Sequence, residues 1–151
     1  TKQQIMIHEE CEILIVEDNP EDAELMLRSL KKMHLANQVI HLEDGAEALD
    51  FILNQGAYAQ RKNFIAPRVM LLDLKLPKVH GLEVLKEIKS NPGTRNIPVV
   101  IITSSREDPD IKKAYELGAN SYIVKPIDFK DFMDTLSHIG FYWMVVNERP
   151  N

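Results

Sequence analysis

The stretch Val69-Met70-Leu71-Leu72-Asp73 places a carboxylic acid directly after four consecutive apolar residues. An apolar run of this length is typical of a strand that is buried in a parallel sheet. Three other strand-like runs also end in reactive polar side chains, namely Ile13–Val16 before Glu17 and Asp18, Val99–Ile102 before Thr103, and Ser121–Val124 before Lys125. Because the carboxyl ends of parallel strands open on one edge of a sheet, we expect three carboxylates, a hydroxyl and an ammonium group to converge there.

Amphipathic segments alternate with these runs along the chain. The expected strands are Glu12–Val16, Gln38–Leu42, Val69–Leu72, Val99–Ile102 and Ser121–Val124. The expected helices begin near Pro20, Gly45, Leu82, Pro109 and Asp128. This alternation predicts an α/β fold, a doubly wound five-stranded parallel sheet with helices on both faces.

Short polar residues and glycine mark several helix ends. Asn19 and Asp44 each precede an expected helix and are favourable N-caps, because their side-chain oxygens accept from free backbone N–H groups. Gly118 is a candidate C′ residue at the end of the fourth helix. The segment Gln55–Arg68 is expected to form a long loop before the third strand.

Length and composition exclude several classes of protein. A chain of 151 residues is expected to hold one domain, and its net charge of −5 argues against a nucleic-acid-binding surface. The single cysteine, Cys11, excludes an intrachain disulfide and is expected to be a buried thiol in a reducing compartment. No apolar stretch is long enough to span a membrane, and residues 1–10 lack a signal-peptide pattern, so the expected location is the cytoplasm.

The predicted cluster suits a divalent cation and a phosphoryl group. Mg²⁺ prefers hard oxygen ligands, which Asp18, Asp73 and a backbone carbonyl would supply directly and Glu17 through a water molecule. Lys125 and Thr103 would face the phosphoryl oxygens, where placed cations and donors stabilise developing charge. Asp73 is itself a competent nucleophile, because carboxylates form acyl phosphates.

Each motif also has a purely structural explanation. The Glu17–Pro20 and Thr103–Ser105 segments could serve only as helix caps, and Lys125-Pro126 could be a simple turn. All of them stand at the same end of a predicted strand, which favours the functional interpretation of the set. The five histidines lack a metal-binding spacing and are interpreted as surface or loop residues. The sequence also contains no GxGxxG or GxxxxGK[ST] motif.

These motifs resemble a known family. The residues that carry the resemblance are Ile13-Leu14-Ile15-Val16-Glu17-Asp18-Asn19, Leu71-Leu72-Asp73-Leu74-Lys75-Leu76-Pro77, Ile102-Thr103-Ser104 and Val124-Lys125-Pro126. They look like the receiver domains of two-component response regulators, over about Cys11 to Gly140. The resemblance implies a flavodoxin-like strand order of 2-1-3-4-5. Within the family the chain is similar to the stand-alone regulators that partner cyanobacterial phytochromes, through its long loop, Lys75–Lys78 and the Phe141-Tyr142-Trp143 segment.

The resemblance implies a role for each matching residue. Asp73 would accept a phosphoryl group from a sensor histidine kinase, such as a phytochrome. The ligands of Mg²⁺ or Mn²⁺ would be Glu17, Asp18, Asp73 and the backbone carbonyl of Lys75. The phosphoryl oxygens would contact Thr103 and Lys125, and Tyr122 would be the aromatic switch that turns inward when Thr103 moves. Lys75 and His80 depart from the residues that many members carry, and the Lys75 ammonium could alter the access of hydrolytic water.

The expected domain organisation is an N-terminal extension (1–10), a receiver domain (11–140) and an apolar C-terminal tail (141–151). The family leads us to expect output by protein contact, through the helix that begins near Pro109, the strand Ser121–Val124 and the helix that begins near Asp128. The tail is expected to extend a homodimer face beside that last helix, since contiguous apolar surface usually marks an interface. The interpretation includes no DNA-binding domain and no membrane partner.

Three rival interpretations remain open. An aspartate-nucleophile phosphatase or phosphotransferase would place a general acid two residues after the nucleophile, where this chain has Lys75. A flavodoxin-type electron carrier would need a phosphate-binding loop where this chain has the acidic pair Glu17-Asp18. A degenerate, phosphate-independent receiver is disfavoured by the intact acceptor, acidic pair, threonine and lysine. The interpretation adopted is a phosphoacceptor switch and not an enzyme with an external substrate.

Overall fold

The computed structural model describes residues 11–32, 38–62, 64–125, 130 and 134 of the chain. The strands are β1 (Ile13–Val16), β2 (Val39–Leu42), β3 (Val69–Leu72), β4 (Val99–Thr103) and β5 (Ser121–Val124). The helices are α1 (Pro20–Lys32), α2 (Gly45–Leu53), the short 3-10 helix η2 (Gly56–Tyr58), α3 (Gly81–Ser90) and α4 (Asp108–Glu116). Lys130 and Asp134 are helical, while the rest of the expected fifth helix and the regions 1–10 and 141–151 lie outside the described residues.

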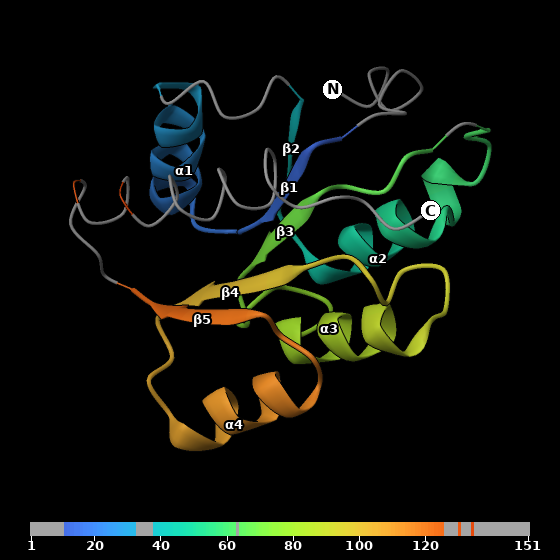
Figure 1. The fold of residues 1–151 in the computed structure, drawn as a ribbon. Coiled ribbons are helices and arrows are strands. Elements are labelled where there is room, and N and C mark those ends of the chain that lie inside the picture. The colour runs from blue at the N-terminus through green and yellow to red at the C-terminus, as the bar shows by residue number, and fades with distance from the viewer. Residues whose placement is uncertain (1–10, 33–37, 63, 126–129, 131–133, 135–151) are drawn as a thin grey trace.

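The five strands form one parallel sheet in the order β2-β1-β3-β4-β5 (Figure 1). This confirms the predicted doubly wound fold and its flavodoxin-like order. The order in which successive strands are added to the sheet reverses at β1, which has β2 on one side and β3 on the other. In an open α/β sheet, ligands bind outside the carboxyl ends of the strands at this point.

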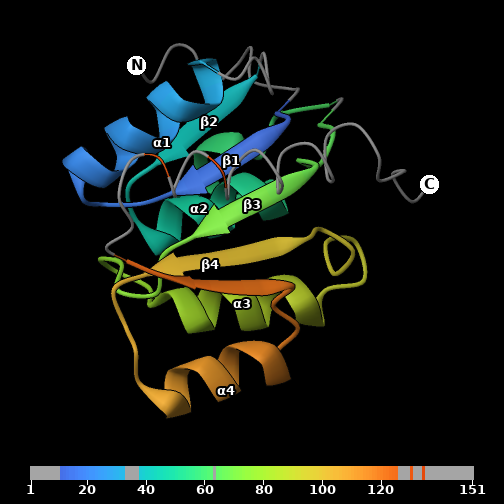
Figure 2. The ribbon, with the colours of Figure 1, turned by 60° about the vertical axis from the view of Figure 1, so that its left-hand side comes forward.

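Alternating side chains bury the two faces of the sheet in separate cores. Ile13 and Ile15 of β1 pack with Met26 and Leu30 of α1. Leu14 and Val16 face the opposite way, into a larger core with residues of α2 and α3. Figure 2 shows α1 on one side of the sheet and α2 and α3 on the other. Burial on both faces explains why the central strands β1 and β3 are apolar throughout, as the sequence predicted.

The strand register aligns the ends that carry the polar residues. Val16 pairs with Leu72, and Thr103 pairs with Val124. The ladder continues one residue further, because the Asp73 N–H donates to the Val16 carbonyl at 3.1 Å. The Lys125 N–H donates to the Thr103 carbonyl at 2.7 Å. The backbone therefore fixes where each polar side chain leaves the sheet.

The predicted helix ends are confirmed. The Asn19 Oδ1 accepts from the Asp22 N–H at 3.0 Å at the start of α1, and the Asp44 Oδ1 accepts from the Glu47 N–H at 2.7 Å at the start of α2. Gly118 follows α4 with a φ of 107°, a conformation that favours glycine.

Element bounds differ slightly from those expected. β1 and β2 each begin one residue later, β4 extends one residue further to Thr103, and α4 begins at Asp108. The Glu12 N–H still donates to the Gln38 carbonyl at 2.8 Å, so these two residues continue the contact without belonging to the strands. Hydropathy does not resolve such terminal residues, because helix and strand ends fray into turns.

The segment Gln55–Arg68 is more ordered than the expected long loop. It contains η2, and the Arg61 guanidinium lies 4.5 Å from the ring centroid of Phe51, 4.8 Å from that of Tyr58 and 4.0 Å from that of Phe64. Cation–π contact with three rings packs this segment against α2. The sequence pattern missed the cluster because its members follow neither helical nor strand periodicity.

One histidine, interpreted as a surface or loop residue, is less exposed than expected. His41 lies half-buried in β2, and its Nε2 is 2.7 Å from the Glu17 carbonyl oxygen. Apolar Ile40 and Leu42 flank it, so its polar side chain follows the alternation expected of a strand at the edge of the sheet. His80 is exposed and accepts from the Leu82 N–H as the N-cap of α3, and Cys11 is buried as predicted.

Gly81 is expected to be essential for the close approach of α3 to the end of β3. A Cβ at Gly81 would overlap the Asp73 carbonyl oxygen and lie 2.6 Å from the Leu74 Cα. We predict that Gly81→Ala lowers the free energy of unfolding by about 2 kcal/mol, because backbone must move to relieve the overlap. Urea unfolding measures this. Gly93→Ala is the matched control, since its Cβ would meet only the Asn91 side chain at 3.3 Å, and equal losses in both variants would contradict the prediction.

Candidate functional site

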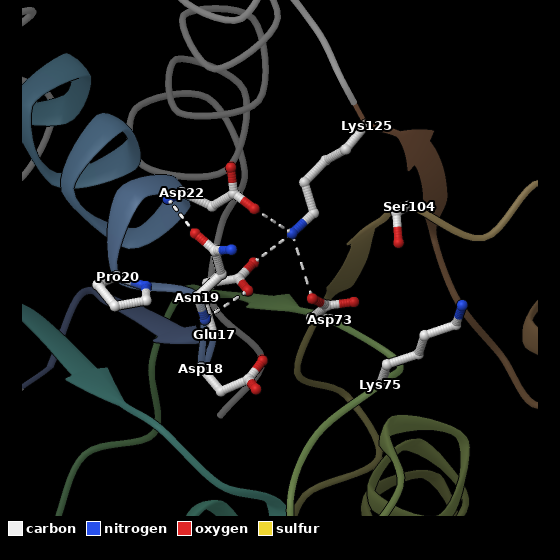
Figure 3. Close-up of a pocket in the computed structure, with 9 residues that line it drawn as sticks. All are labelled: Glu17, Asp18, Asn19, Pro20, Asp22, Asp73, Lys75, Ser104 and Lys125. Atoms are coloured by element: carbon white, nitrogen blue, oxygen red, sulfur yellow. Dashed lines mark hydrogen bonds and ion pairs between the residues drawn. The ribbon is translucent and has the colours of Figure 1, made fainter.

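An open cleft of about 590 Å³ lies at the carboxyl ends of β1, β3, β4 and β5 (Figure 3). The residues that line it are Glu17, Asp18, Asn19, Pro20, Asp22, Asp73, Lys75, Ser104 and Lys125. The structure thus brings together Glu17, Asp18, Asp73 and Lys125, which the sequence predicted to converge. Glu17 and Asp18 follow β1, Asp73 follows β3 and Lys125 follows β5, so the parallel sheet itself brings the four side chains together.

The Lys125 ammonium group lies among three carboxylates. Its Nζ is 2.8 Å from Glu17 Oε1, 2.7 Å from Asp22 Oδ2 and 3.2 Å from Asp73 Oδ2 (Figure 3). An ammonium group has three N–H donors, so these contacts satisfy it completely. Hydrogen bonds between ionised groups are among the strongest in proteins, and the Lys125 side chain is only 13% exposed.

Glu17, Asp18 and Asp73 form a compact acidic cluster. Each offers one carboxylate oxygen, and these three atoms all lie within 4.8 Å of one another. Glu17 and Asp73 are buried, whereas Asp18 is exposed at the mouth of the cleft. Hard oxygen donors that converge on one point suit Mg²⁺ or Mn²⁺, and a cation would relieve the repulsion among the carboxylates. The residues present therefore fit a divalent cation.

The two carboxylate oxygens of Asp73 have different surroundings. Oδ1 accepts from the Leu74 N–H at 2.6 Å, while Oδ2 faces the Lys125 ammonium. Only 6% of the residue is exposed, and that exposure is toward the cleft. A backbone donor and an ammonium group hold the carboxylate in one orientation beside the open space.

Thr103 and Tyr122 are linked through Ser105. Thr103 is fully buried and is not among the residues that line the cleft, where Ser104 stands instead. The Thr103 hydroxyl accepts from the Ser105 N–H at 3.4 Å, and the Tyr122 hydroxyl donates to the Ser105 carbonyl at 3.0 Å. Ser105 also donates to the Asp110 carboxylate, which connects this segment to α4.

Four lining residues, Asn19, Pro20, Asp22 and Ser104, are not among the site residues that the sequence predicts. Asp22 contacts Lys125 directly, Asn19 donates its N–H to Glu17 Oε2 at 3.1 Å, and Ser104 lies beside the cleft. Asp22 stands in the first turn of α1, which starts at the same edge of the sheet as the strand ends. An acidic residue in the first turn after β1 was therefore an available signal. Lys75 lines the cleft as expected, with an exposed side chain.

Burial and neighbouring charge shift two pKa values. Burial, reinforced by the charge of Asp73, raises the pKa of Glu17 to about 7 despite its hydrogen bond to Lys125. Burial opposes the charge of Lys125, but hydrogen bonds to Asp22 and Glu17 outweigh it and raise the pKa of Lys125. Lys125 therefore stays charged at neutral pH, whereas burial favours the protonated form of Glu17.

Comparison with known proteins identifies the family. Residues 13–137 match the family model described as the response regulator receiver domain. The chain belongs to this family. It is 41% identical to the probable methanogenesis regulatory protein FilR2 of Methanothrix harundinacea over 139 residues, which cover 91% of this chain and 86% of FilR2. It is 40% identical to the response regulator Rcp1 of Synechocystis over 138 residues, which cover 91% of this chain and 92% of Rcp1.

Solved structures give the same assignment. The Mn²⁺-bound form of Rcp1 has a TM-score of 0.82 at 37% identity, covering 94% of this chain and 100% of Rcp1. The phosphorylated cyanobacterial phytochrome response regulator RcpA has a TM-score of 0.83 at 35% identity, covering 93% and 99%. The bacteriophytochrome response regulator RtBRR has a TM-score of 0.75 at 48% identity, covering 93% and 84%. This receiver is thus a response regulator of two-component systems, homologous to phytochrome response regulators.

One further relative has a name that describes an enzyme. A probable cyclic di-GMP phosphodiesterase of Vibrio cholerae is 30% identical over 78% of this chain, but the match spans only 24% of that protein.

Among the described residues, no helix has the length and apolar character needed to cross a bilayer.

Glu17 is expected to make the cation-free protein less stable as the pH rises. Its pKa is about 7 in the folded protein and near 4.5 when unfolded, so between these values the folded state holds a proton that the unfolded state has lost. Unfolding then releases a proton, and raising the pH favours it. We predict that the free energy of unfolding contributed by Glu17 falls from about pH 4.5 to about pH 7.

Urea unfolding at a series of pH values in EDTA measures this effect. Glu17→Gln should flatten the decline across that window, because the amide does not titrate. Glu116→Gln removes an exposed carboxylate and should leave the decline unchanged. Parallel pH profiles for the wild-type protein and Glu17→Gln would contradict the assignment.

Proposed function

We propose that Asp73 accepts a phosphoryl group from a phosphohistidine of a sensor histidine kinase, with a divalent cation beside it. The observation that carries this proposal is the position of Asp73 beside the Lys125 ammonium and within an acidic cluster that suits a divalent cation. Glu17 and Asp18 converge with Asp73 on a point suited to Mg²⁺, and the Lys125 ammonium lies 3.2 Å from Asp73 Oδ2. The backbone carbonyl of Lys75 is proposed as a further cation ligand.

The chemistry assigned to the chain begins with attack by an Asp73 carboxylate oxygen on phosphorus. A P–O bond to Asp73 forms as the N–P bond of the phosphohistidine breaks, which yields an acyl phosphate. Lys125 would turn from Glu17 and Asp73 to the phosphoryl oxygens and offset their charge, and Thr103 would donate its hydroxyl. A bound Mg²⁺ or Mn²⁺ would neutralise the acidic cluster and the phosphoryl oxygens.

The signal is proposed to leave the site through Ser105. A Thr103 side chain drawn toward the phosphoryl group gives up its hydrogen bond with the Ser105 N–H. Tyr122 is bonded to the carbonyl of the same residue and would change position with it. Local charge at one residue would thus bias the α4 and β5 surface, together with the expected fifth helix.

The chemistry proposed for the chain is limited to its own phosphorylation and dephosphorylation, without an external substrate. Aspartate-nucleophile phosphatases carry a general-acid carboxyl group two residues after the nucleophile, where this chain has Lys75. An exposed ammonium beside the acceptor would instead influence how hydrolytic water reaches the acyl phosphate.

The proposed partner is a kinase of the phytochrome type, supported by similarity to RcpA and RtBRR. The chain is almost equally identical to Rcp1 and to FilR2, so we propose that surface residues, and not overall similarity, determine which kinase it binds.

We also propose that residues 11–140 form the receiver unit and that output occurs by protein contact without nucleic acid. The proposed location is the cytoplasm, which the buried Cys11 thiol supports.

The apolar tail at 141–151 is proposed to extend a homodimer interface. Six consecutive residues from Phe141 to Val146 are apolar or aromatic, which favours burial against a second copy. Sedimentation should then show a dimer for the full chain and a monomer for a chain that ends at Gly140. An unchanged dimer in the shorter chain would rule out this role.

Acetyl phosphate with Mg²⁺ is expected to add one phosphoryl group to the protein, detected by intact mass. Asp73→Asn should abolish the adduct, because an amide oxygen is a poor nucleophile, and EDTA should suppress it in the wild-type chain. Asp44→Asn alters another loop carboxylate near the same edge and should leave the adduct intact. An adduct that survives Asp73→Asn would refute the proposed acceptor.

A further inference from the structure

Among the described residues, Asp22 is the one partner of the Lys125 ammonium that does not belong to the acidic cluster. Glu17 and Asp73 contact the ammonium and also contribute the oxygens that converge with Asp18. Asp22 contacts the ammonium at 2.7 Å and is absent from that cluster. A cation that occupies the cluster therefore competes with Lys125 for two of its three partners and leaves the third untouched.

We propose that Asp22 is a positioning residue that retains the Lys125 ammonium when a divalent cation takes over the carboxylates of Glu17 and Asp73. This inference rests on the proposed function, because it concerns the same cation and the same acceptor. Without Asp22, the charged partners of the ammonium in the described part of the chain would be Glu17 and Asp73, and the cation would have to displace it from both. With Asp22, the ammonium keeps a charged partner at the edge of the cleft.

The local structure holds Asp22 in place for this role. Its N–H donates to Asn19 Oδ1 at 3.0 Å, and the Asn19 N–H in turn donates to Glu17 Oε2 at 3.1 Å. Asp22 thus reaches Lys125 from α1, on the opposite side of the ammonium from Asp73 (Figure 3). Its side chain is 35% exposed, against 1% for Glu17, so the contact remains open to solvent when the inner carboxylates bind a cation.

Charge explains why a retaining partner is needed. The Lys125 side chain is only 13% exposed, and an unpaired ammonium at that depth would carry a large desolvation cost. A divalent cation nearby would also repel it. A carboxylate outside the cation cluster offsets both effects while leaving the ammonium within reach of Asp73.

A simpler role for Asp22 is stabilisation of the α1 N-terminus by its negative charge. Glu21 lies in the same first turn and is exposed, so it has the same relation to the helix dipole. Asp22 differs from Glu21 in its contact with the Lys125 ammonium, which lies 2.7 Å from Asp22 Oδ2. Glu21→Gln is therefore a matched control, which removes one charge from the same turn and preserves the Asp22 contact.

The test is the affinity of the full chain for Mn²⁺ alone, measured by electron paramagnetic resonance of the free ion. We expect Asp22→Asn to weaken Mn²⁺ binding about fivefold, from the loss of one charge-assisted hydrogen bond at a partly exposed site. Glu21→Gln should change the affinity less than about twofold, as an exposed charge is screened by solvent and salt. Asp22→Glu, which keeps the charge, should restore most of the loss.

A double-mutant cycle with Lys125→Met separates positioning from a direct effect of the Asp22 charge. In the Lys125→Met background, adding Asp22→Asn should change the Mn²⁺ affinity less than about twofold, because the ammonium is gone. The inference would be overturned if Asp22→Asn still weakened Mn²⁺ binding about fivefold in that background. It would also be overturned if Asp22→Asn and Glu21→Gln weakened Mn²⁺ binding equally.

A crystal structure of the wild-type chain with Mn²⁺ tests the inference without a variant. The Lys125 Nζ should stay within hydrogen-bond distance of Asp22 and withdraw from Glu17, and loss of the Asp22 contact would contradict the inference. Failure of the proposed function is distinguishable. In that case the wild-type chain itself would bind no Mn²⁺ and form no adduct with acetyl phosphate, whatever residue stands at position 22.

Discussion

The repulsion among carboxylates at the end of β1 and β3, offset by a single ammonium, is the constraint on which the site depends. The apolar strands force this arrangement, because their register brings Glu17 and Asp73 to adjacent positions at one edge of the sheet. Lys125 arrives from β5 and satisfies all three of its donors on carboxylates. The same low exposure that strengthens these contacts raises the pKa of Glu17. A divalent cation at the acidic cluster would offset the repulsion among its carboxylates.

The fold and most of the site could be predicted from the sequence, because buried parallel strands appear as apolar runs and their ends as the polar residue that follows. Asp73, Glu17 and Lys125 were found in this way. Asp22 was missed because it follows no strand, and its contact with Lys125 depends on the direction in which α1 leaves β1. His41 was missed because one polar residue in a strand has no distinctive pattern.

Family membership explains the common architecture of the sheet and its acidic cleft. Neither the segment packed by Arg61 nor the exposed Tyr115 of α4 contributes to the lining of the acidic cleft. Ser105 connects the cleft to α4 through Asp110 and to β5 through Tyr122. A small displacement at Thr103 would therefore reach both elements, since the packed backbone between them has little freedom to absorb it.

The most direct test of the account is the location of the phosphoryl group along the chain. Sodium borohydride reduces an aspartyl phosphate to homoserine, which tandem mass spectrometry of the digested protein can place. After treatment with acetyl phosphate and Mg²⁺, the account predicts homoserine at position 73 and at none of the other aspartates of the cleft. Homoserine at position 18 or 22, or none at all, would contradict it.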